Sequence, residues 1–448
     1  MILTLLVVAS TIFTVLLLLL PSPANRSDQR CSVQVVVLGD LGRSPRMQYH
    51  ALSIATHGGH VQLVGYRETD PLPELLSHPH VAIVPLSQAP HSLQTSNKVL
   101  FLLYGPLKVL LQAWSLWQAL SYSTPACKWM LVQNPPSIPT LLLVSVVAFF
   151  RRTRLVVDWH NFGYSILALK LGAGHPLVRM SKLYETALSR IAYANFTVTD
   201  AMAKVLRSDY GITAPVLTLH DRPANLYQPL TDMQRLSFLQ RYHPVNAHFN
   251  ALVDGKARLL VSSTSWTPDE DFGILLDALC SYSASATSTH PQLPELVVVI
   301  TGKGPQKQLY LDKIKELRAA DALEMVPIYT DWLSFEDYAL LLGSADLGVS
   351  LHTSSSGVDL PMKVVDMFGA GLPVAGWSKF PAWSELVTED VNGKGFGSPE
   401  ELAGILRELF DPASKKLVQL KHGARLESQR RWTSEWDPVA GRLFGVVP

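Results

Sequence analysis

The sequence predicts an α/β protein made of two doubly wound domains behind an N-terminal transmembrane helix. Its 448 residues are more than one ordinary hydrophobic core accommodates, so two domains are expected. Short apolar runs, as expected of buried parallel strands, alternate with longer helical patterns over most of the chain. The segment 2–20 is an exception, because it contains no charged side chain at all.

This uncharged segment is predicted to be a membrane anchor. As a helix it would be about 28 Å long, close to the roughly 30 Å of a bilayer's hydrocarbon core. Pro21 and Pro23 follow it, and lysine and arginine occur only beyond it, which places the rest of the chain in the cytosol by the positive-inside rule. The alternative is a cleaved signal peptide with a small-residue site at 22–24, although such peptides usually start with basic residues and have a shorter apolar run.

Charge and cysteine content exclude several classes of protein. Lysine and arginine number 38 and aspartate and glutamate 37, so no strong field favours nucleic acid or an acidic polymer as partner. The three cysteines, Cys31, Cys127 and Cys280, are too scattered for a disulfide framework or a zinc pattern, which fits a reducing compartment.

The N-terminal half opens with a βαβ unit. Residues 33–38 form a continuous apolar run typical of a buried strand, and a second strand is predicted at 61–65. Between them Ser44 suits the N-cap and Pro45 the first position of a helix that ends near Thr56. The preceding loop lacks the third glycine of a dinucleotide fingerprint, so a nicotinamide enzyme is not expected. This region either seats the phosphate of an acceptor or is only a tight turn; the candidate phosphate-binding residues are Gly42, Arg43 and Arg46.

The next strands are predicted at 81–85 and 129–133. One apolar segment, 99–120, lies between them, and another, 138–150, follows the second strand. Residues 99–120 are almost free of charge and contain two tryptophans, so we expect this segment to touch a membrane surface. The thirteen residues 138–150 are also apolar or small, but they are short for a span. A buried crossover helix is the simpler expectation there, and a helix lying in the membrane interface is the alternative.

A polar cluster follows the strand predicted at 155–157. Ligands of open α/β sheets bind beyond the carboxyl ends of strands, and Asp158 and His160 lie at such an end. An acid–imidazole couple of this kind can take a proton from a hydroxyl group, although the same side chains could also only satisfy neighbouring backbone groups. Tyr164 follows in a predicted turn and is a further candidate residue for binding the acceptor. A helix around 177–191, a strand at 196–199, a helix from Asp200 and a strand at 216–219 complete this half.

A second sheet pattern starts after a proline-containing connection at 220–256, which we expect to hold one short helix. Its first strand, at 259–262, ends in a hydroxyl-rich loop with Ser263 and Thr264 as candidate ligand-binding residues. The predicted parts are an anchor (1–22), an N-terminal domain (31–222), a linker (223–257), a C-terminal domain (258–425) and a C-terminal helix or tail (426–448).

A capping box explains the acidic residues that follow this loop. Thr267 fits the N-cap of a helix and Glu270 its return partner. The acids at 269–271 resemble the acid–any–acid metal clamp of some sugar-transfer enzymes, but the capping box accounts for them. The sequence therefore predicts no metal ion at this position.

A second loop at a strand end follows the strand predicted at 296–300. Its glycines allow the backbone to approach a ligand closely, and Lys303 can reach a phosphate. The spacing of a Walker loop is missing, so a P-loop site is not expected. The remaining elements are predicted as a helix to 318, a strand at 324–328, a helix from Ser334, strands at 345–351 and 374–375, and helices at 382–387 and 399–409.

We expect the donor site to be organised around the loop and helix at 352–373. A serine- and glycine-rich loop feeds a helix in which Pro361 suits the first turn, so free backbone N–H groups and the helix dipole favour an anion. A helix that starts near Asp359 would place Asp359, Lys363 and Asp366 on one face, as a cation for phosphate between two acceptors for sugar hydroxyls. A capped helix with a solvated charged stripe is the alternative. The loop residues concerned are Ser354, Ser355, Ser356 and Gly357.

The loops at Ser263, Lys303 and Ser354 all follow strands of one predicted parallel sheet. The carboxyl ends of parallel strands meet at one edge, so we expect the three loops to converge on one ligand that carries several phosphates.

Five stretches of the sequence are long enough to compare with known families. They read GDLGRSPRMQYHA (39–51), DWHNFGYS (158–165), SSTSWTPDEDF (262–272), ITGKGP (300–305) and GSADLGVSLHTSSSGVDLPMKVVDMFG (343–369). They closely resemble the eukaryotic β-1,4-mannosyltransferases that add the first mannose to dolichyl-diphosphate-chitobiose. The resemblance covers nearly all of the chain after the anchor.

The resemblance implies a GT-B fold, in which two Rossmann-like domains face each other across a cleft. It implies GDP-mannose as the donor, the 4-hydroxyl of the outer N-acetylglucosamine as the acceptor, inversion at the anomeric carbon, and no metal or other cofactor. It also implies a single-pass protein of the endoplasmic reticulum membrane with its catalytic domains on the cytosolic face. Other mannosyltransferases of the same pathway are candidate partners.

The same resemblance assigns roles to some residues. GT-B enzymes often carry two acids eight positions apart near the donor. Asp366 matches the second acid, which usually meets the nucleotide ribose, whereas the first position is occupied by Val358 with Asp359 beside it. His160 resembles the histidine that related enzymes place beside the transferred sugar.

The implied mechanism uses a base and several positive groups. His160 backed by Asp158, or else Asp40, removes the acceptor proton, and the hydroxyl attacks the anomeric carbon in line with the leaving group. The charge that grows on GDP is stabilised without a metal ion by Lys303, Lys363 and the loop 354–357.

Two other functions remain open on the sequence. One is a different lipid-linked GT-B glycosyltransferase that uses a UDP-sugar. The other is a catalytically silent membrane scaffold, which is disfavoured because polar residues lie at strand ends in both halves.

Overall fold

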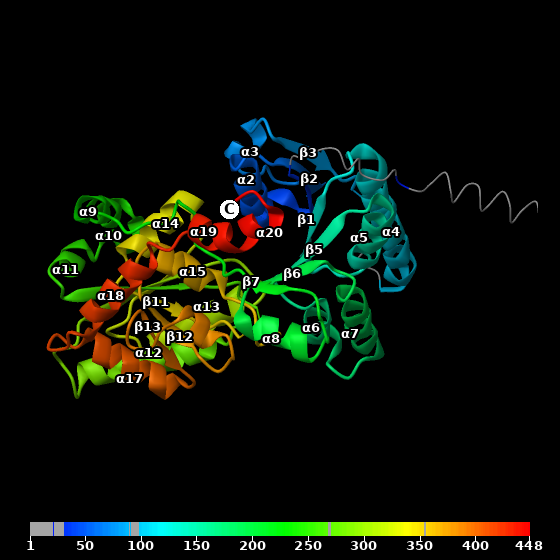
Figure 1. The fold of residues 1–448 in the computed structure, drawn as a ribbon. Coiled ribbons are helices and arrows are strands. Elements are labelled where there is room, and N and C mark those ends of the chain that lie inside the picture. Colours follow the sequence, from blue (N-terminus) through cyan, green and yellow to red (C-terminus); the bar gives the residue numbers. More distant parts are fainter. Residues whose placement is uncertain (1–20, 22–30, 89, 91–97, 268–269, 354) are drawn as a thin grey trace, which may run out of the picture. The chain divides into compact units, whose positions relative to one another are not determined.

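The computed structural model describes residues 21, 31–88, 90, 98–267, 270–353 and 355–448 (Figure 1). The anchor predicted over 1–22 therefore lies outside the described residues, except for Pro21. The chain divides into two compact units: the first comprises Met1–Val198, Met202–Leu219 and Trp436–Pro448, and the second Thr199–Ala201 and His220–Glu435. None of the helices in the described part has both the length and the apolar character needed to span a bilayer.

The described residues of the first unit form a seven-stranded parallel sheet in the order β3-β2-β1-β4-β5-β6-β7. Strands β1 and β4 are buried along most of their length, which explains their continuous apolar runs. The strands are β1 Ser32–Asp40, β2 His60–Tyr66, β3 Val81–Pro85, β4 Trp129–Asn134, β5 Arg154–Trp159, β6 Ala194–Thr197 and β7 Val216–Thr218.

The helices of the first unit follow the strands in alternation, as the apolar pattern predicted. Helix α2 begins at Pro45, as expected, but the hydroxyl of Ser44 donates to the carbonyl of Asp40 and does not cap the helix. Figure 1 shows α4 beside α5 and α6 beside α7. The helices are α2 Pro45–Thr56, α3 Pro73–Ser77, α4 Lys98–Gln118, α5 Thr140–Arg151, α6 Gly163–Leu171, α7 Pro176–Ser189, α8 Asp200–Ser208, whose first two residues belong to the second unit, and α20 Arg442–Phe444.

The last residues of the chain return to the first unit. Trp436 and Phe444 are almost completely buried, and the ring of Phe444 packs edge-on against Trp129 and Phe196 at centroid distances of 5.4 and 6.1 Å. The tail predicted over 426–448 is therefore divided, since its residues up to Glu435 belong to the second unit.

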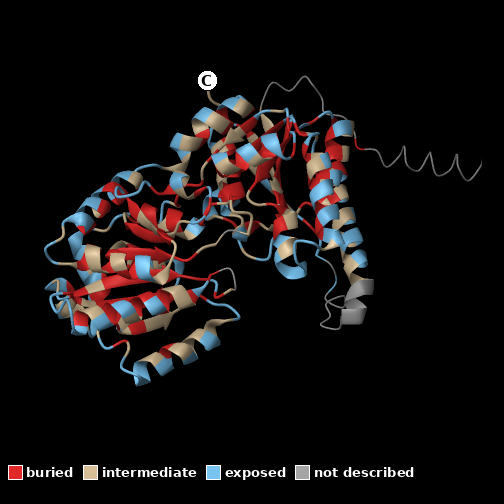
Figure 2. Cartoon of the chain, turned by 90° about the horizontal axis from the view of Figure 1, so that it is seen from below, coloured by how far each residue is buried: buried red, intermediate tan, exposed pale blue. Residues whose placement is uncertain are grey.

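The second unit contains a six-stranded parallel sheet in the order β10-β9-β8-β11-β12-β13. Its apolar core includes Leu260, Val298 and Leu347 from the central strands and Leu279 from a covering helix. In Figure 2 the buried residues are concentrated in the sheets, while the outer sides of the helices are exposed. The strands are β8 Ala257–Ser263, β9 Glu295–Thr301, β10 Ile328–Asp331, β11 Leu347–Ser350, β12 Val374–Trp377 and β13 Gly393–Phe396.

The predicted linker over 223–257 belongs to the second unit and contains three helices instead of one. Each helix is short, so none shows a lasting apolar period in the sequence, but Phe238, Val245 and Leu252 are buried. The helices of this unit are α9 Asp232–Arg241, α10 His243–Asn246, α11 Phe249–Val253, α12 Phe272–Thr287, α13 Lys307–Ala319, α14 Phe335–Ser344, α15 Met362–Gly369, α16 Trp383–Leu386, α17 Pro399–Phe410, α18 Lys416–Glu427 and α19 Trp432–Trp436, whose last residue belongs to the first unit.

Two strands of this unit differ from the prediction. The strand expected at 324–328 begins only at Ile328, because the chain turns before it and Pro327 has no N–H for a ladder. Strand β13 was not predicted at all, since the sequence Gly393–Phe396 has two glycines and no β-branched residue.

Candidate active site

Each sheet has a point at which the strand order reverses. In the first unit the chain runs from β1 out to β3 and then returns to β4 on the other side of β1. In the second it runs from β8 to β10 and returns to β11 on the other side of β8. Ligands of doubly wound sheets bind beyond the carboxyl ends of strands at such points, so each unit offers one candidate edge.

In the first unit, Asp158 is the centre of a buried charged cluster at the end of β5. The guanidinium of Arg46 donates to both of its carboxylate oxygens, at 2.8 and 3.0 Å. His160 Nε2 lies 3.0 Å from Asp158 Oδ2, and His50 Nε2 lies 3.3 Å from the same oxygen. The predicted couple of Asp158 and His160 is therefore present, and the structure adds His50, which had not been predicted.

Electrostatics keep the Asp158 carboxylate ionised. Burial alone would raise its pKa, but the charge of Arg46 and the contacts with His160 and His50 outweigh burial and hold the pKa well below its usual range. The side chain of Asp158 is completely buried, whereas that of His160 is 25% exposed. His160 is thus the member of the cluster that a substrate can reach.

Arg46 is not available for an acceptor phosphate, which corrects the prediction. Its side chain is 4% exposed, and besides the two bonds to Asp158 it donates to the carbonyl of Leu219 at 2.8 Å. Arg43, in contrast, is 74% exposed and lies 3.5 Å from Asp40. Of the two arginines only Arg43 is placed to meet a phosphate, and its acceptor role remains a prediction.

Asp40, the other predicted base, is held in place by hydrogen bonds from a neighbouring loop. It accepts hydrogen bonds from the N–H groups of Glu68 and Thr69, both at 3.1 Å, and from the hydroxyl of Thr69 at 2.6 Å. Burial raises its pKa, but these bonds outweigh burial and lower the pKa overall. Gly42 belongs to the same packing, because a Cβ atom there would lie 2.3 Å from the Thr69 hydroxyl.

A second buried acid supports the start of helix α6, which holds Tyr164 where the sequence had predicted only a turn. The carboxylate of Glu185 accepts from the N–H of Gly163 at 2.7 Å, from the hydroxyl of Tyr210 at 3.1 Å and from the hydroxyl of Ser137. Burial raises the pKa of Glu185 despite these bonds. The acceptor role of Tyr164 remains a prediction, since its ring lies against Phe162 and under the amino group of Lys182.

Two strand-end loops converge in the second unit, as predicted. Thr301 Oγ1 donates to Ser263 Oγ at 3.2 Å, which joins the ends of β9 and β8. The glycines of the β9 loop permit this approach: a Cβ atom at Gly302 would lie 1.9 Å from the carbonyl oxygen of Thr264, and one at Gly304 would lie 1.7 Å from that of Ser265. Neither glycine can carry a side chain in this arrangement.

Glu270 joins helix α15 to the loop after β8. It is 3% exposed and accepts from the N–H of Ser265 at 2.7 Å and from the hydroxyl of Thr264. Its other oxygen is 2.6 Å from the amino group of Lys363 at the start of α15. The capping box predicted for Glu270 is wrong, because helix α12 starts at Phe272 with Asp271 as its cap.

The predicted row of Asp359, Lys363 and Asp366 on one helix face is also wrong. Helix α15 starts at Met362, with Pro361 in the capping position, so Asp359 precedes the helix. Asp359 instead lies 3.4 Å from His352 Nε2 and accepts from the Ser356 hydroxyl at 3.3 Å. Pro361, which was expected in the first turn of the helix, is therefore the residue just before the helix begins.

Asp366 and Lys303 complete this edge. Asp366 is mostly buried, and burial together with the nearby Asp221 carboxylate raises its pKa to about 7. The amino group of Lys303 lies 4.4 Å from the ring centroid of Trp332, and its side chain is exposed. Among the predicted loop residues, Gly357 has a positive φ of 75°, Ser355 and Ser356 lie in the same bend, and Ser354 lies outside the described residues.

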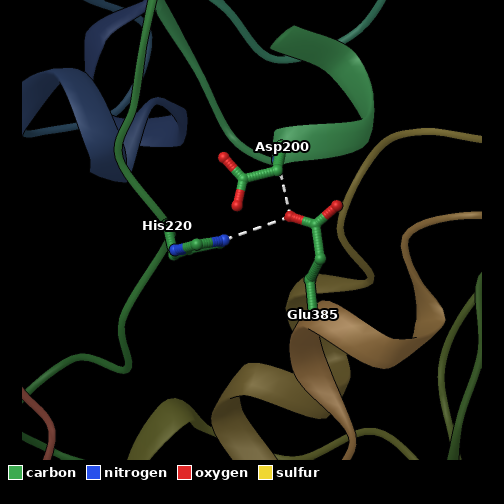
Figure 3. A group of neighbouring side chains, drawn as sticks. All are labelled: Asp200, His220 and Glu385. Atoms are coloured by element: carbon green, nitrogen blue, oxygen red, sulfur yellow. Dashed lines mark hydrogen bonds and ion pairs between the residues drawn. The ribbon is translucent and has the colours of Figure 1, made fainter. Parts of the chain in front are cut away.

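One group of acids and a histidine in the described residues has its ligand atoms within 4.8 Å of one another, namely Asp200, His220 and Glu385. In Figure 3 dashed lines join the Glu385 carboxylate to Asp200 and to His220. This carboxylate accepts from the N–H groups of Asp200 and Ala201 at 2.5 and 2.7 Å and lies 3.2 Å from His220 Nε2. These contacts, all between residues of the second unit, account for the position of the Glu385 carboxylate.

Comparison with known proteins defines the class. No family model matches the chain. The glycosyltransferase WaaG, involved in lipopolysaccharide biosynthesis, superposes with a TM-score of 0.60 at 14% identity, over 92% of this chain and 99% of that one. This similarity shows the fold, which is that of GT-B glycosyltransferases with two Rossmann-like domains.

Sequence similarity is far closer. The chitobiosyldiphosphodolichol beta-mannosyltransferase of Arthroderma benhamiae is 54% identical over 85% of both chains, and relatives from Yarrowia lipolytica and Homo sapiens with the same name are each 43% identical. An Arabidopsis thaliana relative named UDP-glycosyltransferase TURAN is 42% identical, over 92% of this chain and 97% of its own. The chain belongs to the chitobiosyldiphosphodolichol beta-mannosyltransferase family and is a glycosyltransferase.

Proposed function

We propose that the protein transfers mannose from GDP-mannose to the 4-hydroxyl of the outer N-acetylglucosamine of dolichyl-diphosphate-chitobiose, with inversion and without a metal ion. The names of the relatives support the acceptor and the sugar. The observation that carries the proposal is the couple of Asp158 and His160, in which a buried, ionised carboxylate orients a partly exposed imidazole at a strand end.

His160 acts as the general base. A neutral imidazole with its Nε2 proton directed at Asp158 presents the lone pair of Nδ1 for the acceptor proton. As the hydroxyl oxygen forms its bond to the anomeric carbon, the bond to the diphosphate breaks and the proton passes to Nδ1. Asp40, the other candidate base, is disfavoured because Glu68 and Thr69 occupy its oxygens.

The leaving diphosphate meets the edge formed by β8, β9 and α15. Lys303 is an exposed cation at this edge, and the loop residues Ser355, Ser356 and Gly357 have small side chains and backbone N–H groups suited to an anion. Lys363 is paired with Glu270, and we propose that it positions the β8 loop while its remaining N–H groups face the diphosphate. Asp366 is proposed to bind a ribose hydroxyl.

The test is a transfer assay with the purified full-length chain and phytanyl-diphosphate-chitobiose. We expect product with GDP-mannose in the presence of a chelator, and a fall in kcat of about 10²–10⁴-fold for His160→Ala, the usual worth of a general base. His290→Ala, at an exposed histidine of the second unit, is the matched control. Loss of activity with chelator and recovery with Mg²⁺, or near wild-type turnover of His160→Ala, would contradict the mechanism.

A UDP-sugar donor is the second candidate, because the Arabidopsis relative is named a UDP-glycosyltransferase. Donor competition in the same assay separates the two. Inhibition by GDP but not by UDP at equal concentration supports the first proposal, and the reverse result supports the second.

We propose further that the protein is held at the endoplasmic reticulum membrane, with its catalytic domains in the cytosol, by the anchor at 1–22 and by a face of the first unit. Large apolar side chains are exposed on four neighbouring helices, among them Leu110, Trp114, Phe149, Leu169, Met180 and Leu183. From 98 to 193 the acids are Asp158 and Glu185, both completely buried, so the exposed charges of these helices are all positive. An apolar surface with only cations suits an anionic bilayer.

A further inference from the structure

The cluster around Asp158 contains side chains for which the proton transfer described above gives no role. His50, on helix α2, is completely buried, and its Nδ1 accepts a hydrogen bond of 2.9 Å from the indole N–H of Trp436. Its other nitrogen lies 3.3 Å from Asp158 Oδ2, the oxygen that also meets His160. A continuous row of contacts therefore runs from Trp436 through His50 and Asp158 to His160, within the first unit.

The contact with Trp436 determines which nitrogen of His50 carries the proton. An indole nitrogen can only donate a hydrogen bond, so the Nδ1 atom of His50 must be the acceptor and carry no proton. The neutral ring then has its proton on Nε2, where it faces the carboxylate of Asp158. A protonated ring would place a second N–H against that of Trp436, so the contact excludes the cation.

Packing prevents the ring of His50 from turning. Phe196 stacks on it with a centroid distance of 5.6 Å and an interplanar angle of 19°, and Trp436 meets it edge-on at 6.5 Å. Burial also lowers the pKa of His50, which agrees with a neutral ring.

We propose that Trp436 and His50 are positioning residues for His160: they supply Asp158 with an uncharged hydrogen-bond donor, and so leave its carboxylate to orient His160 with Nδ1 free to act as the base. The inference rests on the proposed function, because it takes His160 as the base. It also gives a role to the C-terminal residues, which bring Trp436 to the sheet of the first unit.

The neutrality of His50 matters because other charges are close. Arg46 already contributes one positive charge to Asp158, and His160 becomes positive when it accepts the proton. Beyond Trp436 lie His57, which stacks on the indole at 5.6 Å, and Asp437, 3.6 Å from His57. A cationic His50 would repel the proton that His160 must accept.

The first experiment removes the indole N–H and keeps an aromatic ring. For Trp436→Phe in the full-length enzyme we expect kcat to fall on the order of tenfold, a part of the 10²–10⁴-fold contribution of a general base, with KM for donor and acceptor almost unchanged. Because His50 can then bind a proton at Nδ1, the acid limb of the plot of log kcat against pH should move to lower pH. These two changes together are not expected from a loss of packing alone.

Trp129→Phe is the matched control. Trp129 is also buried, belongs to the same unit and touches the C-terminal segment through Phe444, but its indole nitrogen has no hydrogen-bond partner in the described part of the chain. We expect its kcat and pH profile to stay near wild type. If Trp436→Phe and Trp129→Phe behave alike in both measurements, the inference is wrong.

The second experiment separates the two polar contacts of His50, the hydrogen bond from Trp436 and the 3.3 Å contact with Asp158. The amide nitrogen of glutamine can take the place of Nε2 and donate to Asp158, whereas the amide oxygen of asparagine can only replace Nδ1 as acceptor for Trp436. His50→Gln should therefore keep most of the activity, and His50→Asn should lose on the order of tenfold. Equal activity of the two variants would overturn the assignment.

A spectroscopic measurement does not depend on activity. In the wild-type protein labelled with ¹⁵N-histidine, the resonances of His50 should show a protonated Nε2 and an unprotonated Nδ1, and Trp436→Phe should change this pattern. A protonated Nδ1 in the wild type refutes the inference. Failure of the proposed function would look different, because His160→Ala would then retain turnover whatever the state of His50.

Discussion

At the scale of single residues, the cost of burying charge explains most of the active-site cluster. The side chains of Arg46 and Asp158 are 4% and 0% exposed, and two such charges are tolerated in a protein interior only when they are paired and hydrogen-bonded. The guanidinium provides two donors to one carboxylate and a third to the Leu219 carbonyl. Arg46, which the sequence predicted to bind a substrate phosphate, therefore supports Asp158 and with it His160, the base that we propose.

Asp366 yields a prediction about pH, because burial and Asp221 raise its pKa to about 7. Its folded pKa lies above the unfolded one, so its contribution to stability is fully present below about pH 4 and is lost as the pH rises through 7. Asp366→Asn should therefore be more stable than the wild type at pH 8, by an amount on the order of a few kcal/mol, and the difference should vanish in acid. Thermal unfolding at several pH values measures this.

The same substitution should weaken donor binding. An amide replaces the carboxylate that we propose for the ribose hydroxyl, so KM for the donor should rise while the protein becomes more stable at alkaline pH. A variant that is neither more stable at pH 8 nor weaker in donor binding would show that Asp366 is ionised and solvated in the folded protein.

At the scale of elements, close approach of backbones shapes the edge formed by the loops after β8 and β9, where we propose that the donor binds. The loops after β8 and β9 meet at distances that only glycine allows at Gly302, whose φ is 146°. The sequence showed the glycines and the strand ends but not which loop they approach. That depends on the strand order β9-β8-β11, which no local pattern contains.

A pair of glycine substitutions tests this packing. Gly302→Ala forces a methyl group onto the Thr264 carbonyl and should destabilise the protein by more than about 1 kcal/mol and raise the donor KM. Gly404→Ala, inside helix α17 with no atom within 4 Å of the new methyl, should stabilise it by about 0.5–1 kcal/mol and leave KM unchanged. Chemical denaturation and donor titration of the two variants provide the comparison. Similar behaviour would mean that the two loops are not in contact.

At the scale of the whole molecule, the distribution of charge over the first unit suits a membrane surface although the net charge of the chain is only +1. The two acids within 98–193, Asp158 and Glu185, are completely buried. The charged residues that helices α4 to α7 expose are therefore lysines and arginines, beside apolar residues. Overall composition could not reveal this, since it averages one cationic face with the rest of the chain.

We therefore predict that the protein binds lipid vesicles even when the proposed anchor at 1–22 is removed. The chain from residue 31 onward should float with vesicles that contain phosphatidylserine and not with neutral ones, and binding should weaken with salt because surface charges are screened. Combined Leu110→Glu and Leu183→Glu should abolish flotation, and Met233→Glu with Val418→Glu, at equally exposed sites of the second unit, should not. If flotation depends neither on lipid charge nor on any of the four substitutions, the proposal that α4 to α7 face the membrane is wrong.

The sequence by itself determined the alternation of strands and helices, the polar loops at strand ends, and the couple of Asp158 and His160, because apolar periodicity and strand ends are local features. Only the tertiary structure decided what these residues contact. Arg46 meets Asp158 across 112 positions, Lys363 meets Glu270 across 93, and Trp436 meets His50 across 386. Such pairs form because polar groups that are buried must be hydrogen-bonded. Which groups lie close enough to pair depends on how the sheet and its helices pack, and a local sequence pattern does not contain that information.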